Sequence, residues 1–322
     1  MPFLLTRRSF IAGLGALAAS SSLPTLRMLA GLESGCSSPA LPVMPVASDS
    51  SAMRFGYAAI TWGGNDVQAI KDVSEVGFRG IQLRSPIIKD FGDRPTALQE
   101  LLKQYHLEMV ALSSGDARID QGKEADQIAL HTRNAEFVRS VGGDYLQVIG
   151  APRPKDRKPT AEEYRKLGQL LTQIGKRTSD IGVPLGLHNH MNSLAEAPDE
   201  VDRILNEADP RYVKLELDIA HYQQGGGDPV KAVKQYRERI LFLHLKDVIS
   251  IPVTADGRRP YRFVELGRGR VDVKGVMAAL KEIGFTGWAV VELDAVPDQT
   301  RTPKDCAAIN KKYLEETLGM KV

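Results

Sequence analysis

Short apolar segments alternate with longer amphipathic ones along most of the chain. From Met53 onward, eight short segments are almost continuously apolar, as expected for parallel strands that are buried on both faces. They span residues 54–61, 79–83, 107–113, 145–149, 183–188, 212–218, 240–246 and 288–293. This pattern predicts eight strands, each followed by a connection long enough to hold a helix.

The intervening segments carry helix signals. Residues 161–180 place four apolar side chains on one face at helical spacing, namely Leu167, Leu170, Leu171 and Ile174. Residues 273–283 follow Asp272, whose carboxylate suits the first position of a helix. Three glycines stand where helices are expected to end, since glycine adopts the left-handed conformation of a C-cap: Gly77, Gly182 and Gly284.

Eight strand–helix units over roughly 265 residues predict a single α/β domain, a (β/α)8 TIM barrel over residues 53–322. A doubly wound sheet usually has fewer strands and a glycine-rich phosphate-binding turn after the first. No such turn follows Thr61. The glycines at 267 and 269 do not join a strand to a helix, so we expect them to serve turn geometry.

The composition is that of a soluble globular protein, with 43% hydrophobic and 25% charged residues. The net charge of +2 arises from 42 basic and 40 acidic residues that are mixed along the chain, which argues against a nucleic-acid partner. No apolar run is long enough for a membrane span in the mature protein. With only Cys36 and Cys306, a disulfide framework is not expected.

The first residues have the character of an export signal. Arg7 and Arg8 precede a short apolar run of small residues, 12–19, that is too short to span a membrane. The paired arginines resemble a twin-arginine signal, which is recognised by the machinery that exports folded proteins. We therefore predict a twin-arginine signal peptide at 1–33, with an ordinary secretory signal as the alternative.

Both kinds of signal predict a periplasmic or extracellular protein. Residues 34–52 are rich in Ser, Pro and Ala without periodicity, which is typical of a linker. Glu33 lies where a lipoprotein signal needs an aliphatic residue before Cys36, so a lipid anchor is not favoured.

Ligand-type side chains gather at the ends of four consecutive predicted strands. The carboxyl ends of barrel strands converge on one face, so residues distant in sequence meet there. Any one of these side chains could be a helix cap, a core histidine or an ion-pair partner, but together they favour a shared cation site. They are His188 and His190, Asp218 and His221, His244, Lys246 and Asp247, and Glu292 and Asp294.

These endings resemble the xylose isomerase-like superfamily of sugar isomerases and epimerases. The likeness runs from Met53 to about Leu318 and rests on the order and spacing of short motifs. They are Leu187-His188-Asn189-His190, Leu217-Asp218-Ile219-Ala220-His221, Leu243-His244-Leu245-Lys246-Asp247, Val291-Glu292-Leu293, and the turn Glu265-Leu266-Gly267-Arg268-Gly269.

The resemblance implies one divalent metal ion, held by His188, Asp218, His244 and Glu292. Four protein ligands leave open positions on a five- or six-coordinate ion, which favours Mn, Mg or Co over Zn. His188 departs from the pattern, since sugar epimerases of this superfamily commonly have glutamate there. Histidine-rich versions of this strand are similar to those of inosose dehydratase and of proteins acting on 3-keto sugars.

The chemistry that the resemblance implies begins with removal of a proton next to a carbonyl, through an enediolate. We expect Glu292 to act as the base. His221 is expected to orient or protonate a substrate oxygen or to support Asp218, and His190 to act as acid/base or as a support for the site. Lys246 is expected to stabilise negative charge or to pair with Asp247 or Glu292.

A metal-dependent isomerase or epimerase acting on a keto or aldo sugar is the first expectation. A carbon–oxygen lyase acting on a keto sugar or keto inositol is the alternative, and a metal-free carbohydrate-binding barrel is a third. A metal endonuclease would need further ligands and a basic groove, neither of which is evident.

Overall fold

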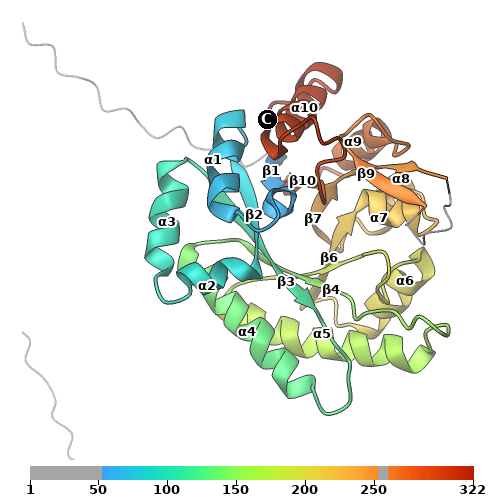
Figure 1. The fold of residues 1–322 in the computed structure, drawn as a ribbon. Helices are drawn as coiled ribbons and strands as arrows, with labels where there is room; N and C mark the ends of the chain where they lie inside the picture. The colour runs from blue at the N-terminus through green and yellow to red at the C-terminus, as the bar shows by residue number, and fades with distance from the viewer. Residues whose placement is uncertain (1–52, 253–259) are drawn as a thin grey trace, which may run out of the picture. The chain divides into compact units, whose positions relative to one another are not determined.

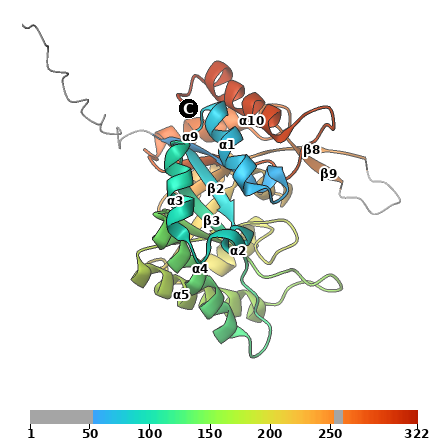
Figure 2. The same cartoon turned by 60° about the vertical axis from the view of Figure 1, so that its left-hand side comes forward.

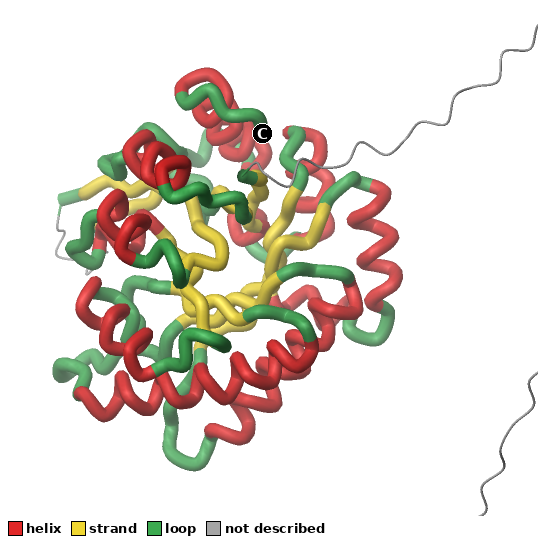
Figure 3. Tube along the Cα trace, turned by 180° about the vertical axis from the view of Figure 1, so that it is seen from behind, coloured by secondary structure: helices red, strands yellow, loops and turns green. Residues whose placement is uncertain are grey.

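The computed structural model describes residues 53–252 and 260–322. Within these residues, eight parallel strands close into a barrel in the hydrogen-bonded order β1-β10-β7-β6-β5-β4-β3-β2, and helices surround it (Figure 1). The tube view from behind shows the same ring of strands inside a shell of helices (Figure 3). The predicted (β/α)8 barrel is therefore confirmed. The predicted signal peptide and linker, at 1–33 and 34–52, lie outside the described residues.

Every predicted strand is present, although several end earlier than expected. The first predicted strand is shortened most, because residues Ala59–Trp62 form a 3-10 turn directly after it. The barrel strands are β1 Arg54–Ala58, β2 Gly80–Arg84, β3 Glu108–Asp116, β4 Tyr145–Ile149, β5 Leu185–His188, β6 Val213–Asp218, β7 Ile240–Leu245 and β10 Trp288–Val291.

The helices follow the sequence signals closely. In α5 the Thr160 side chain and Glu163 form a capping box, and in α9 the Asp272 side chain accepts the backbone N–H of Gly275. Gly77 and Gly182 are C-caps with φ of 101° and 83°. The helices are α1 Asp66–Val76, α2 Ile88–Phe91, α3 Pro95–Gln104, α4 Glu124–Val141, α5 Ala161–Ile181, α6 Pro198–Glu207, α7 Ile219–Gln224, α8 Pro229–Gln235, α9 Val273–Glu282 and α10 Pro303–Lys312.

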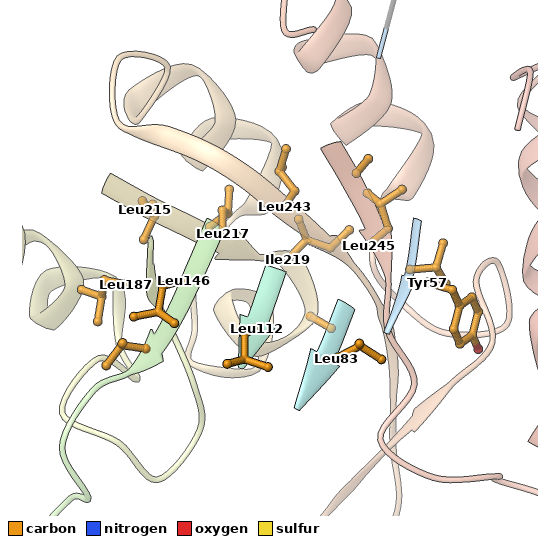
Figure 4. Packing of buried hydrophobic residues seen from close by; sticks show 14 of the residues in the cluster. Tyr57, Leu83, Leu112, Leu146, Leu187, Leu215, Leu217, Ile219, Leu243 and Leu245 are labelled. Carbon is orange, nitrogen blue, oxygen red and sulfur yellow. The ribbon is translucent and has the colours of Figure 1, made fainter. Parts of the chain in front are cut away.

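Alternation along the strands decides which side chains reach the barrel interior. In β6, Leu215 and Leu217 belong to the large apolar cluster that also contains Leu146, Leu187 and Leu243 of other strands (Figure 4). Successive strand residues point to opposite faces, so Glu216 and Asp218 point the other way. The polar members of the strands are thereby turned into the barrel.

A separate apolar cluster fills part of the barrel interior. Phe242, Trp288 and Val290 are fully buried in it. Gly80 is required beside it, since a Cβ there would lie 2.5 Å from the Trp288 ring. The polar residues of the barrel interior therefore gather toward the carboxyl ends of the strands.

One element was not expected from the sequence. β8 Asp247–Ser250 and β9 Tyr261–Val264 form an antiparallel hairpin that projects from the barrel (Figure 2). Asp247 ties its base to the following turn, because its carboxylate accepts four backbone N–H groups, from Val248, Gly267, Gly269 and Val271. Gly267 has a φ of 76°, in agreement with the expected turn role of this segment.

No helix in the described part of the chain is long and apolar enough to cross a membrane.

Candidate active site

The structure brings together the four residues that were predicted to hold a metal ion. His188 and Asp218 end β5 and β6, His244 lies in β7, and Glu292 directly follows β10. One nitrogen or oxygen from each lies within 4.8 Å of the others, and none of the four side chains is more than 8% exposed. Strand alternation and barrel closure thus place four potential ligands around one point.

Three of the four candidate ligands have a buried polar atom without a hydrogen-bond partner, and one of these atoms is His188 Nδ1. His244 Nδ1 and Asp218 Oδ2 make no hydrogen bond, and they lie 3.6 Å apart. Glu292 Oε2 lies 3.4 Å from the same nitrogen. Buried polar atoms without partners are costly, and a cation between them would satisfy them. The donor set therefore fits a divalent ion, and its ligand role remains a prediction.

Neighbouring groups orient the His244 ring toward this point. Its Nε2 lies 2.7 Å from Gln82 Oε1, so a proton on Nε2 is held there and Nδ1 faces the cluster. Burial alone lowers the pKa of His244, but the Glu216 and Glu292 carboxylates outweigh burial and raise it well above its usual value. The site therefore attracts positive charge.

Glu216 is a site residue that the sequence analysis missed. It is fully buried in β6, with Oε2 2.9 Å from His188 Nδ1 and Oε1 3.0 Å from His244 Nδ1. Gln147 Nε2 donates to Oε2 at 2.6 Å. Burial by itself raises the pKa of Glu216, but the two imidazoles bring it down to about 2. The period of two along β6 could have found it, since it shares the inward face with Asp218.

Lys246 lies fully buried beside the cluster. Its ammonium group donates to Glu292 Oε1 at 2.7 Å, pairs closely with Asp294, and lies 4.1 Å from the centre of the Phe263 ring. Burial lowers the pKa of Lys246, but Asp294 and Glu292 outweigh this effect and raise it. Lys246 was expected to pair with Asp247 or Glu292, and the structure shows the pair with Glu292. The Asp247 carboxylate instead accepts backbone N–H groups.

Two further imidazoles, His190 and His221, lie next to Lys246, with ring centroids 4.0 Å apart. His190 is partly exposed, and its Nδ1 lies 2.7 Å from the backbone oxygen of Met191. His221 is buried, and its Nε2 lies 3.2 Å from Lys246 Nζ. Burial and nearby cations lower the pKa of His190 to about 4 and that of His221 well below its usual value. Both rings are therefore neutral at neutral pH.

Asp218 combines two roles that the sequence left as alternatives. Its Oδ1 accepts the backbone N–H groups of Ala220 and His221, which caps α7, while Oδ2 faces the cluster. His221 Nε2 lies 4.0 Å from Oδ2. The aspartate is thus held rigidly by the helix that it starts, and one oxygen remains for a ligand.

A comparison with known families identifies the barrel. The model of the xylose isomerase-like TIM barrel family matches residues 70–312. The chain belongs to this family. The family resemblance inferred from the strand-end motifs is thereby confirmed.

Curated relatives of this xylose isomerase-like chain include dehydratases. Inosose dehydratase of Lacticaseibacillus casei is 26% identical over 298 residues, which cover 83% of this chain and 98% of that protein. The rhizopine catabolism protein MocC of Rhizobium meliloti is 28% identical over 282 residues, covering 77% of this chain and 83% of that protein.

Solved structures of the xylose isomerase-like fold include proteins with several activities. The IolI protein, solved with a bound zinc atom, aligns with a TM-score of 0.68 at 21% identity and covers 83% of this chain and 98% of its own. L-ribulose 3-epimerase aligns with a TM-score of 0.66 at 16% identity and covers 83% of this chain and 95% of its own. These likenesses establish the fold, and the reaction has to be argued from the site.

Proposed function

We propose that the protein is a metal-dependent dehydratase, a carbon–oxygen lyase that removes water from a keto inositol or a related keto sugar. His188, Asp218, His244 and Glu292 would hold one divalent ion. This was the alternative in the sequence analysis, where isomerase or epimerase came first. The curated relatives named inosose dehydratase support the lyase.

The observation that carries this proposal is the asymmetry of the acid/base groups. An epimerase of the two-base type needs a second basic group that reaches the substrate from the opposite face. At the end of β5 this chain has His188, and the nearby carboxylate Glu216 is fully buried beneath the imidazoles. Two carboxylates, Asp218 and Glu292, remain at the ligand cluster, and Asp218 is already held by the backbone of α7, so Glu292 is the candidate base, with His221 close to it.

This arrangement suits an elimination. When bound, a divalent ion supplies Lewis-acid stabilisation of a carbonyl oxygen. Glu292 takes the proton from the carbon next to the carbonyl, and the electron pair of that C–H bond becomes the new carbon–carbon double bond. The hydroxyl on the following carbon leaves as water after receiving a proton.

The proton that Glu292 has taken reaches the leaving hydroxyl through His190, whose neutral imidazole accepts a proton at one nitrogen and gives one from the other. His190 is partly exposed, its Nδ1 lies 2.7 Å from Met191 O, and its ring centroid lies 4.0 Å from that of His221. Lys246 holds Glu292 in place through the contact at Oε1. His221 is buried beside Lys246 and supports the position of its ammonium group.

Within residues 265–272, which the structure describes, both arginines already have polar partners. Arg268 lies 3.8 Å from Glu265, and Arg270 donates to Gln224 at 2.5 Å. We therefore favour an unphosphorylated polyol ketone. We also propose that the protein is exported, as Arg7 and Arg8 indicate, and functions in the periplasm or outside the cell.

Metal analysis followed by proton NMR in deuterated water tests the proposal. The purified protein should contain about one divalent ion per chain, and with a keto inositol it should produce the signals of an unsaturated or diketone product. Signals of an epimer without elimination would contradict the lyase. A protein whose melting temperature does not respond to a chelator, and which binds sugars without metal, would instead be the carbohydrate-binding barrel.

A further inference from the structure

We propose that Glu216 is a positioning residue of the metal site, whose carboxylate orients both imidazole ligands and supplies negative charge beneath them. The inference rests on the metal site of the proposed function, but it does not depend on which reaction is catalysed.

The strand register places Glu216 between the two histidines. His188 and Glu216 are paired across β5 and β6, and Asp218 and His244 are paired across β6 and β7. Glu216 therefore points into the barrel like Asp218, which follows two residues later in β6, and it lies beside His188. Its two oxygens lie 2.9 Å from His188 Nδ1 and 3.0 Å from His244 Nδ1, so one side chain contacts both rings.

Glu216 is a buried carboxylate whose charge is balanced by imidazoles, which are neutral once they bind a metal. In the described part of the chain no lysine or arginine pairs with it, and its Oε1 makes no hydrogen bond. Its hydrogen-bond donor is the neutral amide of Gln147. A carboxylate in the interior is unfavourable unless a cation compensates its charge. A divalent ion bound between the imidazoles would supply that compensation.

The charge of Glu216 also complements the ligand set. Two of the four ligands, His188 and His244, are neutral when they bind a metal, and they are the two that Glu216 contacts. Glu216 does not belong to the four-residue group whose donor atoms lie mutually within 4.8 Å. It therefore acts through the histidines and the local field, while the four residues bind the ion directly.

The substitution Glu216→Gln tests this role, because it removes the charge and keeps nearly the same shape. After chelator treatment, Mn²⁺ binding is measured by titration calorimetry, and circular dichroism and melting of the metal-free variant confirm the fold. Loss of a group that orients metal ligands typically weakens affinity by about 10–100-fold, and we expect a loss of this size. Glu216→Asp, which keeps the charge, should bind Mn²⁺ more tightly than Glu216→Gln, and it serves as the test if the glutamine variant does not fold.

Glu200→Gln is the matched control. Glu200 is also a buried carboxylate, but it bonds Arg153 and Tyr164, so its loss should leave Mn²⁺ affinity at the wild-type value. Co²⁺ at saturation provides a second measurement. Since the four ligands remain in Glu216→Gln, its visible absorption bands should match those of the wild type.

The outcomes separate this inference from the metal site itself. If the wild-type protein binds neither Mn²⁺ nor Co²⁺, the proposed metal site fails. If the wild type binds Mn²⁺ and Glu216→Gln binds it equally well, the role of Glu216 is overturned while the metal site stands. Equal affinities in the Gln and Asp variants would exclude the charge effect, and shifted Co²⁺ bands would make Glu216 a direct ligand.

Discussion

The substitution Glu292→Gln tests the proposed base most directly. The two oxygens of Glu292 face different partners, with Oε1 2.7 Å from Lys246 Nζ and Oε2 3.4 Å from His244 Nδ1. A glutamine has one oxygen, and its NH₂ group cannot accept from the Lys246 ammonium. The amide oxygen should therefore face Lys246, which turns the NH₂ group toward the metal position.

Two effects follow from this geometry. The variant loses one of the four candidate ligand atoms, so its metal affinity should fall and loading needs excess Mn²⁺. It also loses the oxygen that takes the proton. General-base catalysis typically raises the reaction rate by about 10²–10⁴-fold. At about 1.36 kcal/mol for each tenfold change in rate, this corresponds to roughly 2.7–5.4 kcal/mol in the activation free energy of the reaction.

The assay is exchange of the substrate C–H proton in deuterated water, followed by NMR on protein whose metal content has been measured. Asp294→Asn is the control, because it removes another oxygen contact of Lys246 and leaves Glu292 intact. We expect exchange to fall by at least 10²-fold in Glu292→Gln and by much less in Asp294→Asn. If metal-loaded Glu292→Gln exchanges at the wild-type rate, Glu292 is only a ligand and His190 or His221 becomes the base.

Three further predictions concern the metal, the export signal and acid stability. His244→Ala and Asp218→Ala should each lower the metal content of the purified protein severely, as measured by elemental analysis, and a full equivalent in both would remove the metal assignment. Arg7→Lys combined with Arg8→Lys preserves charge but should block export if a receptor recognises the pair, whereas normal export in cell fractionation would indicate an ordinary secretory signal. His131 is buried with its pKa lowered, chiefly by burial, from 6.5 to about 4, so the unfolded chain binds more protons and stability falls as the pH drops from about 6.5 toward 4. The loss from this residue is about 3 kcal/mol at most, and denaturant unfolding should show a shallower pH dependence in His131→Gln; identical pH profiles would refute it.

The candidate ligands could be found from the sequence because each stands at the end of an apolar strand. A chain that alternates buried strands with amphipathic helices has few ways to cover both faces of a parallel sheet, and closing eight units makes their carboxyl ends converge. His188, Asp218, His244 and Glu292 thus meet although more than one hundred residues separate the first from the last. For the same reason the local helix signals at Gly77, Gly182 and Asp272 agree with the observed helix ends.

Contacts that depend on side-chain reach across strands were decided only by the tertiary structure. Glu216 lies between two leucines of β6, and its carboxylate contacts both His188 and His244. These contacts depend on the register of β5, β6 and β7, which the local sequence does not reveal. Lys246 is next to Asp247 in the chain, yet it pairs with Glu292 and Asp294, because consecutive strand residues point to opposite faces. Local pattern and strand closure were enough to predict the barrel and the candidate ligands at the strand ends. The tertiary structure alone decided the pairing of buried charges, since that depends on register and on which oxygens the backbone already occupies.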